Sequence, residues 1–212
     1  MKRSSKWIIL GIIVVVFSII LLCKGCTTDM SANSTDKQNV YNCNVKILKL
    51  STTINIQKDG EKWGQVKGDL WHFVEDPLTL YDAEENKIGY AGDTYHFFTQ
   101  DSHGIYFNNE FKYDMVGKFD MFGETYELYD AEENMVAKAT FNFANTEGKL
   151  VDMADNVLAT FESGMLSHDF NIRIEKDSFI EDEVIIMMFA SYYSDQEYDR
   201  SSTSSTSTTT TS

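Results

Sequence analysis

Proline, cysteine and positive charge are scarce in this sequence of 212 residues. Pro77 is its single proline, which suits continuously paired β-strands because proline cannot donate a hydrogen bond within a sheet. Lysine and arginine number 18 against 33 aspartates and glutamates, giving a formal net charge of −15. Such a surface repels nucleic acid and anionic lipid headgroups, so we expect no nucleic-acid partner and interpret the acidic residues as a solubilising shell.

The three cysteines are too few for a disulfide framework. Cys23 and Cys26 have the spacing of a redox or zinc motif, but they adjoin an apolar run and lack a second pair or a nearby histidine. A Cys26–Cys43 bridge is one interpretation for an exported chain, and free or membrane-embedded thiols are the favoured one. The histidines lie apart, without metal-ligand spacing, and we interpret each as a strand or loop residue: His72, His96, His103 and His168.

Motifs for catalysis and nucleotide binding are also missing from the sequence. It contains no Gly-x-Ser-x-Gly elbow, no P-loop and no Gly-x-Gly-x-x-Gly fingerprint. The abundant carboxylates guarantee close pairs somewhere, so no single pair identifies a glycosidase-like site. We therefore expect no catalytic residue, no cofactor and no metal ion.

A membrane anchor is predicted near the N-terminus. The run from Trp7 to Cys23, WIILGIIVVVFSIILLC, holds 17 residues without a charge and would span about 25 Å as a helix. Lys24 alone follows it closely, whereas three basic residues precede it: Lys2, Arg3 and Lys6. The positive-inside rule then places the N-terminus in the cytoplasm and the rest of the chain outside.

This segment has two alternative interpretations. A cleaved signal peptide has a shorter apolar region and an A-x-A-like site, and a lipoprotein has small residues before its cysteine. We expect a retained signal anchor. The predicted organisation is a transmembrane anchor at residues 1–26, a flexible linker at 27–43, a β-barrel domain at 44–196 and a disordered Ser/Thr-rich tail at 197–212.

Short β-rich runs dominate the middle of the chain. Asp59-Gly60 separates two of them and is a strong hairpin signal, because tight hairpin turns need positive φ. The predicted strands include Val45–Leu50, Thr53–Gln57, Lys62–Lys67, Asp69–Val74, Thr94–Thr99, Val116–Phe122, Met135–Phe143, Val157–Glu162 and His168–Glu175.

The heptapeptide LYDAEEN occurs twice, at residues 80–86 and 128–134, and LVDMADN at 150–156 is a degenerate third copy. Aspartate, three variable residues and asparagine persist between apparent strands. This pattern is typical of a hairpin loop, because aspartate accepts hydrogen bonds from the backbone two residues on and asparagine tolerates the left-handed conformation. A calcium loop is the alternative interpretation. It lacks the turn glycine at position 6 and the glutamate at position 12, and the third copy keeps neither glutamate, so we favour the hairpin.

The last element is different in kind. The run from Val184 to Tyr193 is apolar except for Ser191 and follows acidic residues suited to a helix N-terminus. A helix without a polar face must be buried on all sides or lie in a membrane, and ten residues are too few to span one. About a dozen strands followed by such a helix predict a closed β-barrel wrapped around its C-terminal helix.

The domain resembles the LURP-one-related branch of the tubby C-terminal-like superfamily, whose relatives include the phospholipid scramblases. The resemblance covers residues 45–195 and rests, in order, on INIQKDGEKWGQVKGDLW, LTLYDAEENKIGYA, MVGKFDMFGETYEL, YELYDAEENMVAKA, HDFNIRIE and the apolar helix. It implies a 12-stranded barrel around a central helix. Tubby proteins bind phosphoinositides through a basic pocket. The lysines of this sequence are scattered among acidic residues, so that activity is not carried over. These lysines are Lys62, Lys67, Lys118 and Lys138.

The sequence leaves three functional hypotheses. The first is a membrane-anchored, non-enzymatic and monomeric barrel outside the cytoplasm that binds or scaffolds an unknown protein or lipid ligand. The others are a scramblase-like lipid-interacting protein and a hydrolase that uses an acidic pair. Six aromatic residues could line a sugar or lipid site, although barrel walls packed on the helix are the favoured interpretation: Trp63, Trp71, Tyr95, Phe97, Phe98 and Tyr106.

Overall fold

The computed structural model describes residues 37–48, 51–69, 78–94, 102–120, 123–164 and 168–205. They form one helix, α2 (Asp182–Ser205), and the following strands: β1 (Gln38–Leu48), β2 (Ser51–Lys58), β3 (Glu61–Asp69), β4 (Leu78–Asp82), β5 (Lys87–Asp93), β6 (Ser102–Phe107), β7 (Glu110–Asp120), β8 (Gly123–Asp130), β9 (Met135–Phe141), β10 (Glu147–Asp152), β11 (Val157–Ser163) and β12 (Phe170–Glu175).

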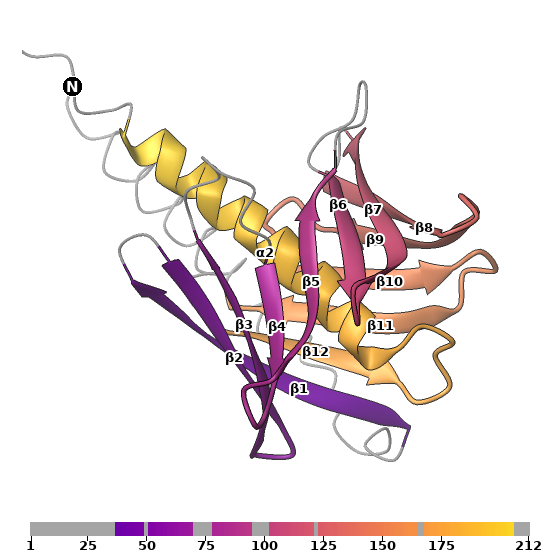
Figure 1. The fold of residues 1–212 in the computed structure, drawn as a ribbon. Coiled ribbons are helices and arrows are strands. Elements are labelled where there is room, and N and C mark those ends of the chain that lie inside the picture. The colour runs from indigo at the N-terminus through magenta and orange to yellow at the C-terminus, as the bar shows by residue number, and fades with distance from the viewer. Residues whose placement is uncertain are drawn as a thin grey trace, which may run out of the picture. The chain divides into compact units, whose positions relative to one another are not determined.

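The strands close into a barrel, as predicted (Figure 1). Each strand pairs antiparallel with its neighbours in the chain, and β1 closes the ring by pairing with both β2 and β12. Because the sheet has no free edge, every strand finds hydrogen-bonding partners on both sides. The 12-stranded closed barrel with one C-terminal helix is therefore confirmed.

Helix α2 fills the barrel (Figure 1). Every residue from Val184 to Tyr193 is at most 4 % exposed, which confirms the prediction of a helix buried on all sides. Twelve strands enclose more space than eight, whose interiors side chains alone can fill. Small buried residues on the inner wall leave additional room for the helix backbone: Ala91, Ala137, Ala139 and Ala159.

Aromatic side chains pack one side of the helix against the wall. Phe141 of β9 stacks on Tyr192 with ring centroids 3.4 Å apart, and Phe161 of β11 lies 5.6 Å from the ring of Phe189. Phe170 of β12 stacks on Tyr193 at 5.1 Å. Buried aromatic pairs of this kind add to the free energy gained by removing apolar surface from water.

The repeated heptapeptide forms hairpin turns in all its copies. Asp82 accepts hydrogen bonds at 2.8 Å from the backbone N–H of Asn86 and at 2.9 Å from its side-chain amide. The same bonds join Asp130 to Asn134 and Asp152 to Asn156. The duplicated motif is thus a structural unit that connects β4 to β5, β8 to β9 and β10 to β11.

One detail of the hairpin prediction is corrected. The left-handed residue is the one before the asparagine, with φ values of 68° at Glu85, 64° at Glu133 and 64° at Asp155. The asparagine instead donates its side-chain amide to the aspartate carboxylate. The β2–β3 turn follows the expected chemistry, since Asp59 and Gly60 both have positive φ, at 55° and 83°.

Two predicted domain limits also change. Strand β1 begins at Gln38, so residues 38–43 belong to the barrel and not to a flexible linker; Tyr41 and Cys43 are both buried. Helix α2 continues to Ser205, beyond the predicted start of the tail at residue 197. The predicted anchor lies outside the described residues, as do most of Asp69–Val74 and Thr94–Thr99. Among the residues described, no helix has the length and apolar character needed to cross a membrane.

Candidate functional site

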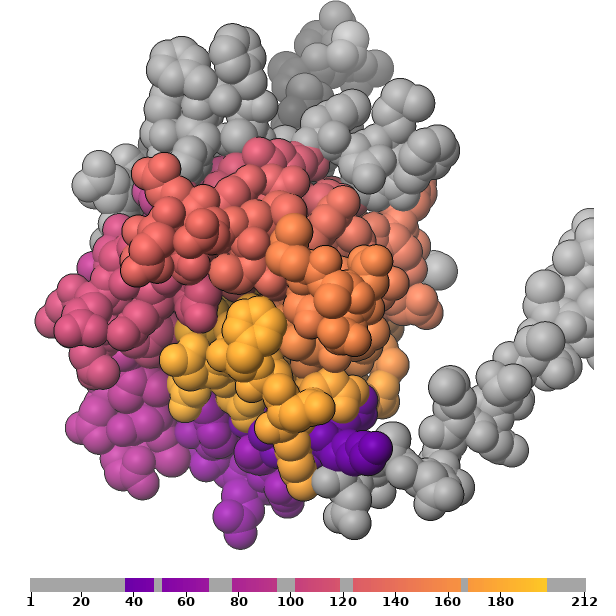
Figure 2. Space-filling model, turned by 90° about the vertical axis from the view of Figure 1, so that its right-hand side faces the viewer, coloured from indigo at the N-terminus to yellow at the C-terminus, as the bar shows by residue number. Residues whose placement is uncertain are grey.

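Among the residues described, the inside of the barrel offers no room for a ligand at the end where α2 begins. Figure 2 views this end, where the start of the helix and the segment before it fill the middle of a ring of strands. Ile180 and Val184 are at most 2 % exposed there. The remaining candidate sites are polar groups at the barrel ends, beside α2 and on the outer wall.

One polar cluster lies between β5, β6 and the distal part of α2. His103 is 4 % exposed, and its Nε2 lies 2.9 Å from Oδ2 of Asp195, which is 6 % exposed. Its Nδ1 lies 3.1 Å from Oδ1 of Asp93. A histidine between two carboxylates resembles a catalytic acid–base group. The protonation state of the histidine decides whether it can act as one.

Burial by itself would lower the pKa of His103, but the charges of Asp195 and Asp93 and their hydrogen bonds outweigh it and raise that pKa to about 10. At neutral pH the ring is therefore an imidazolium with both N–H groups donating. It cannot accept a proton as a general base would. The cluster joins the helix to the wall and is structural in this state.

A second polar cluster holds the start of the helix. Oδ2 of Asp182 accepts hydrogen bonds from the Tyr41 hydroxyl and, at 2.8 Å, from the amide of Asn39. Nζ of Lys58 lies 3.9 Å from the same oxygen. Burial, followed by the hydrogen bond to Asp182, raises the pKa of Tyr41, so its hydroxyl stays protonated and donating. This cluster fixes the first turn of α2 to β1 and β2.

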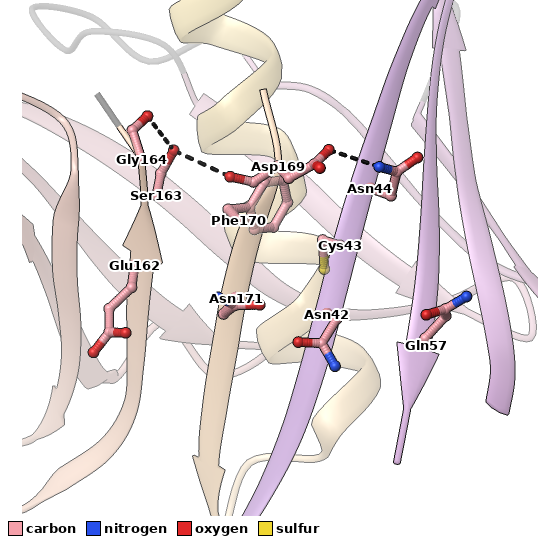
Figure 3. A pocket seen from close by; sticks show the side chains of 10 residues that line it. All are labelled: Asn42, Cys43, Asn44, Gln57, Glu162, Ser163, Gly164, Asp169, Phe170 and Asn171. Carbon is pink, nitrogen blue, oxygen red and sulfur yellow. Dashed lines mark hydrogen bonds between the residues drawn. The ribbon is translucent and has the colours of Figure 1, made fainter. Parts of the chain in front are cut away.

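A hollow of about 650 Å³ lies on the outer wall over four adjacent strands (Figure 3). Its size is within the range of small-molecule sites. Amide, carboxylate and hydroxyl side chains dominate its lining, which comprises Asn42, Cys43, Asn44, Gln57, Glu162, Ser163, Gly164, Asp169, Phe170 and Asn171.

Both carboxylates of the hollow already have partners. Oε1 of Glu162 lies 2.5 Å from the guanidinium of Arg173. Oδ1 of Asp169 accepts hydrogen bonds from the side chain of Asn44 at 2.9 Å and from the backbone N–H of Val45 at 3.1 Å. The negative charge of the hollow is thus offset by the protein's own donors.

Cys43 is a free thiol whose side chain points into the barrel, at 2 % exposure. Burial, with a smaller contribution from Asp169, raises the pKa of this thiol. Because the thiolate and not the thiol is the nucleophile, Cys43 is unreactive in the folded state. The hollow therefore presents polar side chains but no activated cysteine.

The structure separates the residues singled out in the sequence. Trp63 packs on Tyr41 with ring centroids 5.2 Å apart and belongs to the core, as favoured. Tyr106 instead stacks on Tyr90 on the outer wall, at 4.6 Å, and does not pack on the helix. His168 lies 3.3 Å from the Tyr193 hydroxyl. The other candidates lie outside the described residues: His72, His96, Trp71, Tyr95, Phe97 and Phe98.

Sequence reasoning missed the hollow and the partners of His103. Asp195 is 92 residues from His103, and the lining of the hollow comes from β1 and β2 at one end of the domain and from β11, β12 and the segment between them at the other. Within the described ranges, no group of three or more histidine, cysteine, aspartate or glutamate side chains could hold a metal ion. Comparison with protein-family profiles, curated proteins and solved structures returned no match.

Proposed function

We propose that this chain is a membrane-anchored, non-enzymatic binding or scaffold module of the LURP-one-related, tubby-like type, displayed outside the cytoplasm. The observation that carries this proposal is that the inside and the outside of the barrel wall have different contents. The lumen is filled by α2, whereas a polar hollow with unused hydrogen-bonding groups lies on the outer wall. A protein of this design recognises its ligand on its exterior.

The membrane part of the proposal is supported by the sequence alone, through the uncharged run from Trp7 to Cys23 and the basic residues before it. Strand β1 begins at Gln38, which leaves residues 27–37 between the proposed anchor and the barrel. The acidic composition agrees with a domain that stays off anionic headgroups.

The hydrolase alternative receives little support from the hollow. A glycosidase-type mechanism needs one protonated and one ionised carboxyl group in different environments. Glu162 is bound to Arg173, and Asp169 is bound to Asn44 and a backbone N–H. Each carboxyl group is thus held by donors of the protein itself, which is not the free acid–base pair that this mechanism uses.

Cysteine labelling of intact cells tests the topology. In a Cys23→Ser, Cys26→Ser background, Glu132→Cys places a thiol at an exposed hairpin tip, and Cys43 stays buried. A membrane-impermeant maleimide should label this variant in intact cells. The parent without Glu132→Cys is the matched control and should stay unlabelled until it is denatured. Labelling only after permeabilisation would refute the extracytoplasmic placement.

Liposome flotation of the chain tests the scramblase-like alternative. A chain that lacks residues 1–26 should stay with the soluble fraction when mixed with vesicles of phosphatidylcholine, with or without 20 % phosphatidylserine, because the acidic domain is repelled by anionic headgroups. Flotation that depends on phosphatidylserine would favour the lipid-interacting protein instead.

A further inference from the structure

We propose that the outer-wall hollow over β11, β12, β1 and β2 binds a neutral, polyhydroxylated ligand, namely an extended oligosaccharide, through a row of amide side chains. This inference rests on the proposed binding role and names its ligand class. It follows from the strand register, from the groups that the protein leaves unused, and from the closure of the barrel.

The pairing register of the strands places the amide side chains in a row across the barrel wall. Asn42 of β1 is paired with Asn171 of β12 on one side and with Gln57 of β2 on the other, and Asn171 is paired with Glu162 of β11. Figure 3 shows these four side chains on four adjacent strands. Neighbouring strands are about 4.8 Å apart, so a ligand that lies across them meets one polar side chain for about each sugar residue.

A second row continues the same face. Asn44 of β1 is paired with Asn55 of β2, which is paired with Gln65 of β3. Gln65 is only 7 % exposed, and its buried Nε2 has no hydrogen-bond partner among the residues that the structure describes. Amides thus occupy successive outward positions on three adjacent strands.

The groups left for a ligand are neutral. Glu162 and Asp169 are engaged by protein donors, as described above. The side chains of Asn42, Gln57 and Asn171 make no hydrogen bond or ion pair within the part of the chain that the structure describes. Each amide offers two donor hydrogens and one acceptor oxygen, which matches hydroxyl groups that both donate and accept.

A peptide is a poorer fit for this surface. The barrel has no free edge, so an extended peptide cannot add to it as a further strand. Side-chain recognition of a peptide or protein would need an apolar centre. The aromatic residue in the hollow, Phe170, is 2 % exposed and faces the core. Hydroxyl groups distributed along a sugar chain need only the amides.

The test is a titration of the full chain with cellohexaose, maltohexaose and chitohexaose in phosphocholine detergent, which has no sugar headgroup. The readout is the chemical shift of the side-chain NH₂ groups of Asn42, Gln57 and Asn171. We expect saturable shifts with at least one of these probes. Asn42→Thr and Asn171→Thr should each weaken that binding by about 2- to 10-fold, the loss for one hydrogen bond.

The matched control is Lys149→Ala, an exposed and outward-facing position on β10 that is not part of the hollow. It should leave the affinity unchanged. Absence of binding to all three probes, or equal affinity of the two threonine variants and the parent, overturns the inference. So would dimerisation of the parent that Asn42→Thr abolishes, since the hollow would then be a contact between copies. The cysteine-labelling experiment measures topology independently of ligand binding. Its result therefore distinguishes failure of this inference from failure of the proposed topology.

Discussion

The inner and outer faces of the barrel wall differ in the burial and pairing of their side chains, and strand β1 shows the difference within a few residues. Tyr41 and Cys43 point inward and are 1 % and 2 % exposed, whereas Asn42 and Asn44 point outward and are exposed. Inside, the charged groups of His103 and Asp182 are paired. Outside, the amides of Asn42, Gln57 and Asn171 make no hydrogen bond within the described part of the chain. Stability therefore depends mainly on the inner face, and the outer face is the one that remains accessible to the proposed ligand.

The substitution Met188→Asp should have the largest effect on stability. Met188 is 1 % exposed in the middle of α2, so the substitution buries a carboxyl group without a partner. It should cost more than about 4 kcal/mol and unfold the domain. Thermal melting followed by circular dichroism measures the effect. Met153→Asp is the matched control, because Met153 is 59 % exposed in a hairpin turn, and it should melt like the parent.

Removal of the buried counterion should have the next largest effect. Asp195→Ala takes away the carboxylate 2.9 Å from His103 and should destabilise the domain by roughly 2–3 kcal/mol. The loss is limited because the imidazole can release its proton instead of remaining a lone buried charge. Urea unfolding at pH 7 measures it, with the exposed Asp177→Ala as control.

The same pair gives stability a defined pH dependence. The pKa of His103 is about 10 in the folded state and near 6.5 when unfolded, so the folded state binds the proton more tightly. Its contribution is full below about pH 6.5 and is lost as the pH rises through 10. Asp195→Ala should flatten this loss. A parent whose stability is constant from pH 6.5 to 10 would contradict the pairing.

A smaller effect is expected in the repeated turns. Asp82→Ala removes the acceptor of the Asn86 side-chain and backbone donors, whereas Glu84→Ala in the same loop removes an exposed side chain. Only the aspartate variant should lower the melting temperature, and by less than Asp195→Ala does. The Asn86 side chain, then its backbone N–H, lowers the pKa of Asp82, so this contribution is present above about pH 4 and lost as the pH falls.

The smallest effect is expected on the outer wall. Asn42→Thr should change the free energy of unfolding by no more than about 0.5 kcal/mol, because the site is exposed and threonine suits a strand. Its neighbour on the inner face, Cys43→Ser, should cost about 1–3 kcal/mol by burying a hydroxyl group without a partner. Equal costs in chemical unfolding would show that the two faces do not differ as described.

Local patterns carried most of the fold prediction. Three kinds of feature depend only on residues close together in the chain and can be recognised without knowing the fold. They are the Asp59-Gly60 turn, the three Asp-to-Asn turns and the apolar run from Val184 to Tyr193. Strand β6 (Ser102–Phe107) was missed because Ser102, His103 and Gly104 do not look like a strand. His103 can face inward only because Asp195 neutralises it, and that partner is 92 residues away.

The amino-acid sequence by itself determined that this protein would be an acidic β-barrel wrapped around its last helix, because turn chemistry and hydrophobic periodicity are local properties. The tertiary structure alone decided which polar residues act together. Ring closure places β1 beside β12 and so joins Asn42 to Asn171, residues at opposite ends of the domain. Charges become paired and amides become aligned only when the register of every strand between them is fixed.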